Sequence, residues 1–153
     1  MKQQTKILVV DDKRDIVETV SYCLAEEGFE VSAAFDGRQA LDKARAEEPD
    51  LIVLDVMLPG ENGYQVARFL REDSQAGRIS KRPKVLLLTA RTVCDGQRED
   101  FLQTWSGADA VMYKPFDLEE LVRCVKALLA GAWPDASAAE SRVSEKVSRL
   151  VAS

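Results

Sequence analysis

Residues 51–60 read LIVLDVMLPG, and this order of apolar and acidic residues decides the expected fold. The first four residues are continuously apolar and the run stops at Asp55, as is typical of a strand buried on both faces of a parallel sheet. Residues 7–10, ILVV, form a similar run that stops at Asp11 and Asp12. Both expected strands therefore bring carboxylates to the carboxyl-terminal edge of one sheet.

Outward from these two runs, the apolar spacing alternates between strand and helix. Apolar residues three and four positions apart indicate amphipathic helices, and Gly and Asp punctuate their ends. The expected strands are 7–10, 30–34, 51–54, 85–88 and 110–113. The first three expected helices are 15–27, 37–46 and 64–71. A fourth contains Phe101, Leu102 and Trp105 and ends at Gly107. The last begins at Asp117–Glu120, which has capping-box spacing.

Strands that alternate with helices imply right-handed crossovers and an open sheet covered on both faces. We therefore predict an α/β fold for residues 1–130, a flavodoxin-like doubly wound five-stranded parallel sheet with five helices, (βα)5. Residues 131–153 are predicted to be a linker and a possible short C-terminal helix over 140–151. That helix could serve dimerisation, docking or an interdomain linker, and a disordered tail is the alternative.

Composition narrows the classes of function. The chain has 153 residues and a net charge of -5 without a Lys/Arg run, which argues against direct nucleic-acid binding. It contains no His, and Cys23, Cys94 and Cys124 lack CxxC spacing, so Ser/His catalysis, zinc and a disulfide framework are not indicated. No signal-peptide or membrane-spanning run is present, so we expect a cytoplasmic protein without a membrane partner.

Five polar residues are expected at the edge where such sheets bind ligands: Asp11, Asp12, Asp55, Thr89 and Lys114. Converging carboxylates repel one another unless a cation neutralises them. Oxygen-only ligands favour a hard ion, so Mg²⁺ is predicted, with Mn²⁺ as a possible substitute. An aspartate beside a metal and a lysine can act as a nucleophile toward phosphorus.

At this point the chain resembles the response-regulator receiver family over about residues 5 to 130. The resemblance rests on Val9-Val10-Asp11-Asp12, Asp55-Val56-Met57-Leu58-Pro59-Gly60, Thr89-Ala90, Gly107-Ala108-Asp109 and Lys114-Pro115-Phe116.

The resemblance implies a phosphoacceptor at Asp55 rather than an enzyme that acts on external substrates. A sensor histidine kinase or phosphotransfer protein would donate, and the domain would catalyse only its own phosphorylation and dephosphorylation. The implied metal ligands are Asp12, Asp55, the Met57 carbonyl and, mainly through water, Asp11. Thr89 and Lys114 would bind phosphoryl oxygens, with a cis bond before Pro115.

The chain departs from the family pattern in three places. The family commonly has an aromatic residue three positions before the lysine, where this chain has Val111; Tyr113 precedes Lys114 instead. Thr89, Val111 and Tyr113 are the expected switch residues. Residues 91–96 look like an insertion beside the face that contacts partners, and Lys13 stands where an acid is common.

Simpler interpretations stay open. Asp11 or Asp12 could cap the first helix, Thr89 could be an ordinary strand-end hydroxyl, and Lys114 could be solvated. Pro59, Gly60 and Gly63 are interpreted as turn residues.

At the level of function, the alternatives are a phosphorylation-independent pseudo-receiver adaptor and a phosphohydrolase, although the latter usually has a second acid where Met57 stands. The output is expected through a downstream protein partner or an output domain missing from this sequence. A homodimer is possible.

Overall fold

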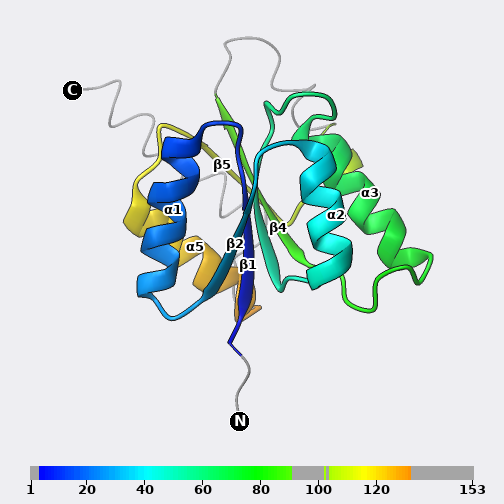
Figure 1. Ribbon diagram of the computed structural model, residues 1–153, viewed down its shortest axis with the longest axis horizontal. Helices are drawn as coiled ribbons and strands as arrows, with labels where there is room; N and C mark the ends of the chain where they lie inside the picture. The colour runs from blue at the N-terminus through cyan, green and yellow to red at the C-terminus, as the bar shows by residue number, and fades with distance from the viewer. Residues whose placement is uncertain (1–3, 91–101, 103, 132–153) are drawn as a thin grey trace.

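The computed structural model describes residues 4–90, 102 and 104–131, and Figure 1 shows their arrangement. Five parallel strands form one sheet in the order β2-β1-β3-β4-β5, which confirms the predicted flavodoxin-like topology. The strands are β1 (Lys6–Val10), β2 (Glu30–Ala34), β3 (Leu51–Asp55), β4 (Lys84–Ala90) and β5 (Ala110–Lys114).

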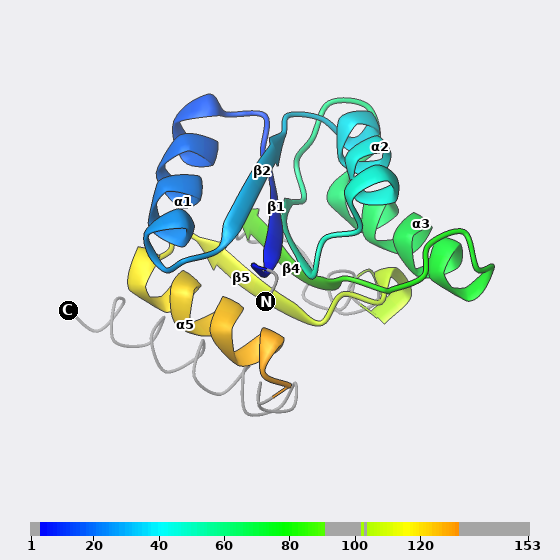
Figure 2. The ribbon, with the colours of Figure 1, turned by 60° about the horizontal axis from the view of Figure 1, so that its bottom comes forward.

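Helices cover both faces of the sheet, as Figure 2 shows. On one face lie α1 (Arg14–Glu26) and α5 (Leu118–Leu129); on the other lie α2 (Gly37–Glu47) and α3 (Gly63–Gln75). Residues 102 and 104–106 are also helical, in the segment where a helix ending at Gly107 was predicted.

Two apolar cores fill the space between the sheet and its helices. Side chains alternate along each strand, so Leu8 and Val10 pack toward α2 and α3, while Ile7 and Val9 pack toward α1 and α5. The residues Ile7–Val10 and Leu51–Leu54 are all buried, with at most 1% of any of them exposed. Burial of both strand faces is the physical reason why these strands are continuous apolar runs.

The predicted elements agree with the observed ones to within one or two residues, except at the end of α3. The predicted helix 64–71 continues to Gln75 because Asp73 is buried and bound by two arginines that the local pattern does not reveal. Asp117 begins α5, as predicted, and its side chain accepts a hydrogen bond from the Glu119 N–H. Cys94, the expected insertion 91–96, Phe101 and residues 132–153 lie outside the described residues.

Candidate phosphoacceptor site

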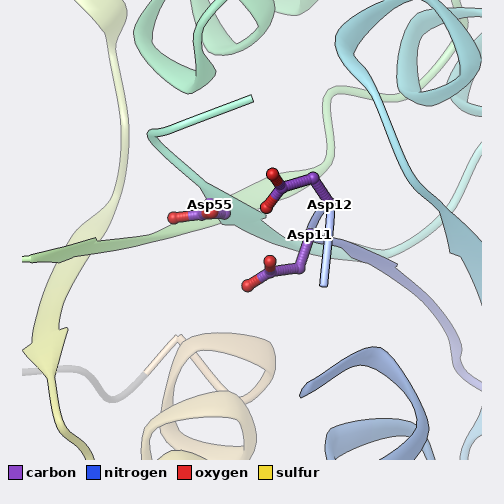
Figure 3. A group of neighbouring side chains, drawn as sticks. All are labelled: Asp11, Asp12 and Asp55. Atoms are coloured by element: carbon purple, nitrogen blue, oxygen red, sulfur yellow. The ribbon is translucent and has the colours of Figure 1, made fainter. Parts of the chain in front are cut away.

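Three carboxylates meet at the carboxyl-terminal edge of the sheet (Figure 3). Asp11 and Asp12 follow β1, Asp55 ends β3, and the register pairs Val10 with Leu54 just before them. One oxygen from each carboxylate lies within 4.8 Å of the other two. Asp11 and Asp55 are buried, with 1% and 3% exposed, whereas Asp12 is exposed. The predicted acid cluster therefore forms, with two oxygen donors inside and one at the rim.

Lys114 completes the site from the end of β5. Its Nζ lies 3.1 Å from Asp11 Oδ2 and 3.3 Å from Asp55 Oδ1, and only 20% of its side chain is exposed. The Lys114–Pro115 peptide bond is cis, as the family resemblance implies. The alternative of a solvated Lys114 is wrong, because this ammonium contacts both buried carboxylates.

Charge in the site is only partly balanced. Burial raises the pKa of Asp55, the neighbouring Asp11 raises it further, and the contacts with Lys114 offset only part of the rise. Burial alone would lower the pKa of Lys114, but its bonds to Asp11 and Asp55 outweigh burial and raise it. Three carboxylates against one ammonium leave excess negative charge that a divalent cation would neutralise. The all-oxygen donor set fits a hard cation such as Mg²⁺.

Asp11 has a second, local role. Its Oδ1 accepts a hydrogen bond of 3.0 Å from the Lys13 N–H, just before α1. The N-cap of α1 is Lys13, which makes no side-chain cap bond, so the idea that Asp11 or Asp12 is the N-cap is wrong. Asp11 instead uses one oxygen to shape the turn after β1 and the other to hold Lys114.

The expected switch residues occupy the neighbouring strands β4 and β5. Thr89 is buried, with 6% exposed, and its Oγ1 donates a 3.3 Å bond to the Ala90 carbonyl. The sheet register pairs Thr89 with Tyr113 and Leu87 with Val111. Val111 packs against the core under α2 and α3, and strand alternation places Thr89 and Tyr113 on that same face. Tyr113, rather than Val111, is therefore the cross-strand neighbour of Thr89.

The loop after Asp55 contains Met57, whose carbonyl is a predicted metal ligand, and it leads to Gly60 and Gly63, the two glycines interpreted as turn residues. The Gly63 N–H donates to the Val56 carbonyl at 2.9 Å, and Gly60 has a φ of +78°, which glycine adopts easily. Gly63 instead begins α3 and packs on the Asp55–Val56 backbone, where an added Cβ would come within 2.8 Å of Val56 Cα. Its role as a turn residue is therefore corrected to one of close packing.

Comparison with known proteins identifies the family. The model of the response regulator receiver domain matches residues 7–126. This chain belongs to the response regulator receiver family. The match spans the whole acid cluster, β4, and Lys114, so the site described above lies entirely inside the receiver domain.

Two curated response regulators are similar over most of the chain. The alkaline phosphatase synthesis transcriptional regulatory protein PhoP of Bacillus subtilis (strain 168) is 40% identical over 146 residues, covering 95% of this chain and 57% of PhoP. The response regulator MprA of Mycolicibacterium vanbaalenii is 41% identical over 136 residues, covering 89% of this chain and 55% of MprA. The receiver chain thus spans a little over half the length of these relatives.

A solved structure agrees with the fold. The chemotaxis response regulator CheY4 of Vibrio cholerae is 32% identical, with a TM-score of 0.70 over 81% of this chain and 98% of CheY4. None of the helices in the described part of our receiver has both the length and the apolarity that crossing a membrane requires.

Two features that build the site escaped the sequence analysis. One is the close approach of Gly63 to the backbone of Asp55 and Val56, which no local pattern indicates. The other is a capping box at the start of α3, where the side chains of Asn62 and Gln65 each bond the backbone N–H of the other. The second had a readable signal, because Asn followed three residues later by Gln is a capping-box pattern.

Proposed function

We propose that this receiver domain accepts a phosphoryl group on Asp55 in a Mg²⁺-dependent step catalysed by its own residues, and that this event switches protein–protein contacts. The observation that carries the proposal is the position of Lys114, whose ammonium lies 3.1 Å from Asp11 and 3.3 Å from Asp55 at the edge of the carboxylate cluster. A fixed positive charge at this point would stabilise the oxygens of an incoming phosphoryl group.

In the proposed reaction, a carboxylate oxygen of Asp55 attacks the phosphorus of a phosphohistidine on a sensor histidine kinase or phosphotransfer protein. The new bond is an acyl phosphate P–O bond, and the P–N bond of the donor breaks with its electron pair left on the imidazole nitrogen. Lys114 holds one phosphoryl oxygen, and the Thr89 hydroxyl donates to another. Hydrolysis later returns the carboxylate of Asp55.

Asp12, Asp55 and the Met57 carbonyl would hold Mg²⁺, with Asp11 contributing mainly through water and Mn²⁺ as a substitute. When bound, the ion would supply positive charge for the phosphoryl oxygens. The fit rests on two observations. All the donor atoms are oxygens, and one oxygen from each of the three carboxylates lies within 4.8 Å of the other two. Burial and the neighbouring Asp11 raise the pKa of Asp55, and a bound cation would favour its ionised form.

The switch that we propose couples Thr89 to Tyr113. Movement of Thr89 toward a phosphoryl group would change the space beside its cross-strand neighbour Tyr113 on β5. Val111 cannot supply an aromatic ring, so Tyr113 would carry the change along β5, the strand at the edge of the sheet. The recipient would be a downstream protein partner or an output domain, because the relatives PhoP and MprA are longer than this chain. A phosphorylation-dependent homodimer is a further possibility, and we place the reaction in the cytoplasm.

The decisive experiment is incubation with acetyl phosphate and Mg²⁺, followed by intact mass spectrometry. The wild-type chain should gain the mass of one phosphoryl group, and Asp55→Asn should gain none. Asp42→Asn, which changes an exposed carboxylate on α2, is the matched control and should behave as wild type.

Each rival function has its own outcome in that experiment. A folded wild-type chain that binds Mg²⁺ but gains no phosphoryl group would favour the pseudo-receiver adaptor, which the intact set of Asp11, Asp55 and Lys114 argues against. Rapid turnover of added phosphoesters would favour a phosphohydrolase, although Met57 stands where such enzymes usually carry a second acid.

A further inference from the structure

Two arginines, Arg71 and Arg82, lie around Gly107 at the amino-terminal ends of the strands, whereas Asp55 lies at the carboxyl-terminal ends. Arg71 comes from the last part of α3, Arg82 lies just before β4, and Gly107 precedes β5. The point that a Cβ of Gly107 would occupy lies 3.2 Å from Arg71 Nη1 and 3.3 Å from Arg82 Nη2. Gly107 has a φ of +76°, so both its backbone conformation and its missing side chain suit this convergence.

The local structure uses only part of this positive charge. The Arg82 guanidinium donates to the Gly107 carbonyl, and Arg68 donates to the Trp105 carbonyl at 3.0 Å. These carbonyl oxygens carry only partial negative charge. Arg68 is also neutralised by Glu72 at 3.0 Å. These partial charges cannot balance the two full charges of Arg71 and Arg82.

No carboxylate among the described residues neutralises the remaining positive charge of Arg71 and Arg82. Within residues 4–90, 102 and 104–131, neither Arg71 nor Arg82 forms an ion pair, although seven other arginine and lysine side chains away from the Asp55 site do: Arg38, Arg45, Arg68, Arg78, Lys81, Arg123 and Lys126. Arg82 is exposed and Arg71 is half-buried, so both remain accessible from solvent. The pair is thus a concentration of positive charge on a chain whose net charge is -5.

We propose that Arg71 and Arg82 form a docking site for a carboxylate of an acidic segment on a partner protein. Guanidinium groups bind carboxylates through paired N–H donors, and arginine clusters commonly anchor acidic motifs. The neighbouring carbonyl oxygens disfavour the denser charge of a phosphate dianion. Arg82 is exposed and Arg71 partly so, which makes both accessible to a side chain presented by another protein.

The test is an NMR titration of the full chain with a capped hexaglutamate peptide at low ionic strength, reading the Nε–Hε signals of Arg71 and Arg82 and the amide of Gly107. These signals should shift, and the shifts should shrink as salt is added, because exposed ion pairs are screened. A hexaglutamine peptide should produce no shift.

Variants distinguish binding at Arg71 and Arg82 from attraction of the peptide to positive charge elsewhere on the surface. Arg71→Gln/Arg82→Gln should weaken hexaglutamate binding by about tenfold, as two solvent-accessible ion pairs predict. Arg71→Gln alone, which removes no bond to the Gly107 carbonyl, should weaken it by about threefold and guards against a folding defect. Arg38→Gln, which changes an exposed arginine on α2, should bind as wild type.

Three results would overturn the proposal: no binding of hexaglutamate, equal binding by the double variant, or equal shifts with inorganic phosphate at matched ionic strength. Phosphorylation of Asp55 by acetyl phosphate should be unchanged in the double variant, so this proposal and the phosphoacceptor proposal can fail independently.

Discussion

At the scale of single residues, Asp55 combines two demands that oppose each other. It must be ionised to act as a nucleophile, yet it is buried beside Asp11, and both conditions raise its pKa. Lys114 is the described cation that contacts it, and that ammonium is shared with Asp11. The metal-free site is therefore a place where the fold gives up stability in favour of chemistry.

Asp55→Asn should stabilise the protein when Mg²⁺ is absent. A carboxyl whose pKa is raised in the folded state contributes stability below its unfolded pKa and loses it as pH rises through the folded pKa. At pH 7 the substitution should therefore raise the free energy of unfolding by about 1 kcal/mol, measured by urea denaturation with EDTA. The gain should shrink as pH falls and vanish below about pH 4. Asp42→Asn should show no such gain, and an equally large gain there would contradict the assignment to the site.

Gly63→Ala should destabilise the protein through a collision rather than through backbone strain. Gly63 is the first residue of α3, and a methyl group added there would press on the Asp55 carbonyl and on Val56 Cα. We expect a loss of about 1–3 kcal/mol in thermal or urea unfolding. Gly77→Ala has open space around it but a φ of +77°, so it measures the conformational cost alone. If Gly63→Ala loses no stability, the close approach of Gly63 has no energetic consequence.

At the scale of secondary structure, the C-terminal end of α3 depends on a buried ion-pair cluster. Asp73 has 2% of its side chain exposed and accepts bonds of 2.8 Å from Arg45 on α2 and 3.0 Å from Arg78 after α3. Burial alone would raise the pKa of Asp73, but the two arginines outweigh burial and lower it. The cluster joins α2, α3 and the chain that leads into β4.

Asp73→Asn should cost about 1–3 kcal/mol at pH 7, a moderate value because both arginine heads are partly exposed to water. A carboxyl with a lowered pKa contributes stability above its unfolded pKa, and that stability is lost as pH falls through the folded pKa. The difference between variant and wild type should therefore narrow below about pH 4 in urea denaturation. A constant difference from pH 7 to pH 3 would show that packing, not charge, is responsible. Asp42→Asn, in an exposed pair, serves as the control.

The elements also show which parts of the structure a sequence can predict. β1 and β3 were predictable because burial on both faces leaves an apolar run that ends abruptly at Asp11 and Asp55. The same logic assembles the site, since parallel strands end at one edge. The end of α3 was not predictable, because Asp73 depends on Arg45 from another helix. The pairing of Thr89 with Tyr113 likewise needed the register of β4 on β5, which local patterns do not contain.

At the scale of the whole molecule, a bound divalent cation should stabilise the native state because the acid cluster exists only when β1 and β3 lie side by side. A ligand that binds only the folded state at one hundred times its Kd adds about 2.7 kcal/mol. For a chain of this size, that corresponds to a rise in Tm of about 5–10 °C.

Differential scanning calorimetry with MgCl₂, against NaCl at equal ionic strength, measures this rise. Asp12→Asn should reduce it strongly, because Asp12 is the proposed metal ligand at the exposed rim of the acid cluster. Asp15→Asn changes a nearby exposed acid on α1 and should keep the full rise. An equal Mg²⁺ effect in the Asp12 and Asp15 variants would contradict the proposed metal site.

The short strands of the sheet have a consequence for how charges at its two edges combine. Strands of five residues set the Asp55 edge and the Gly107 edge about 17 Å apart. That separation is about twice the screening length of roughly 8 Å at physiological salt. Exposed charges at the two ends of the sheet therefore interact only weakly, and the free energies of substitutions there should add. Strong communication between the two ends of the sheet would therefore require displacement of the packed side chains that join them.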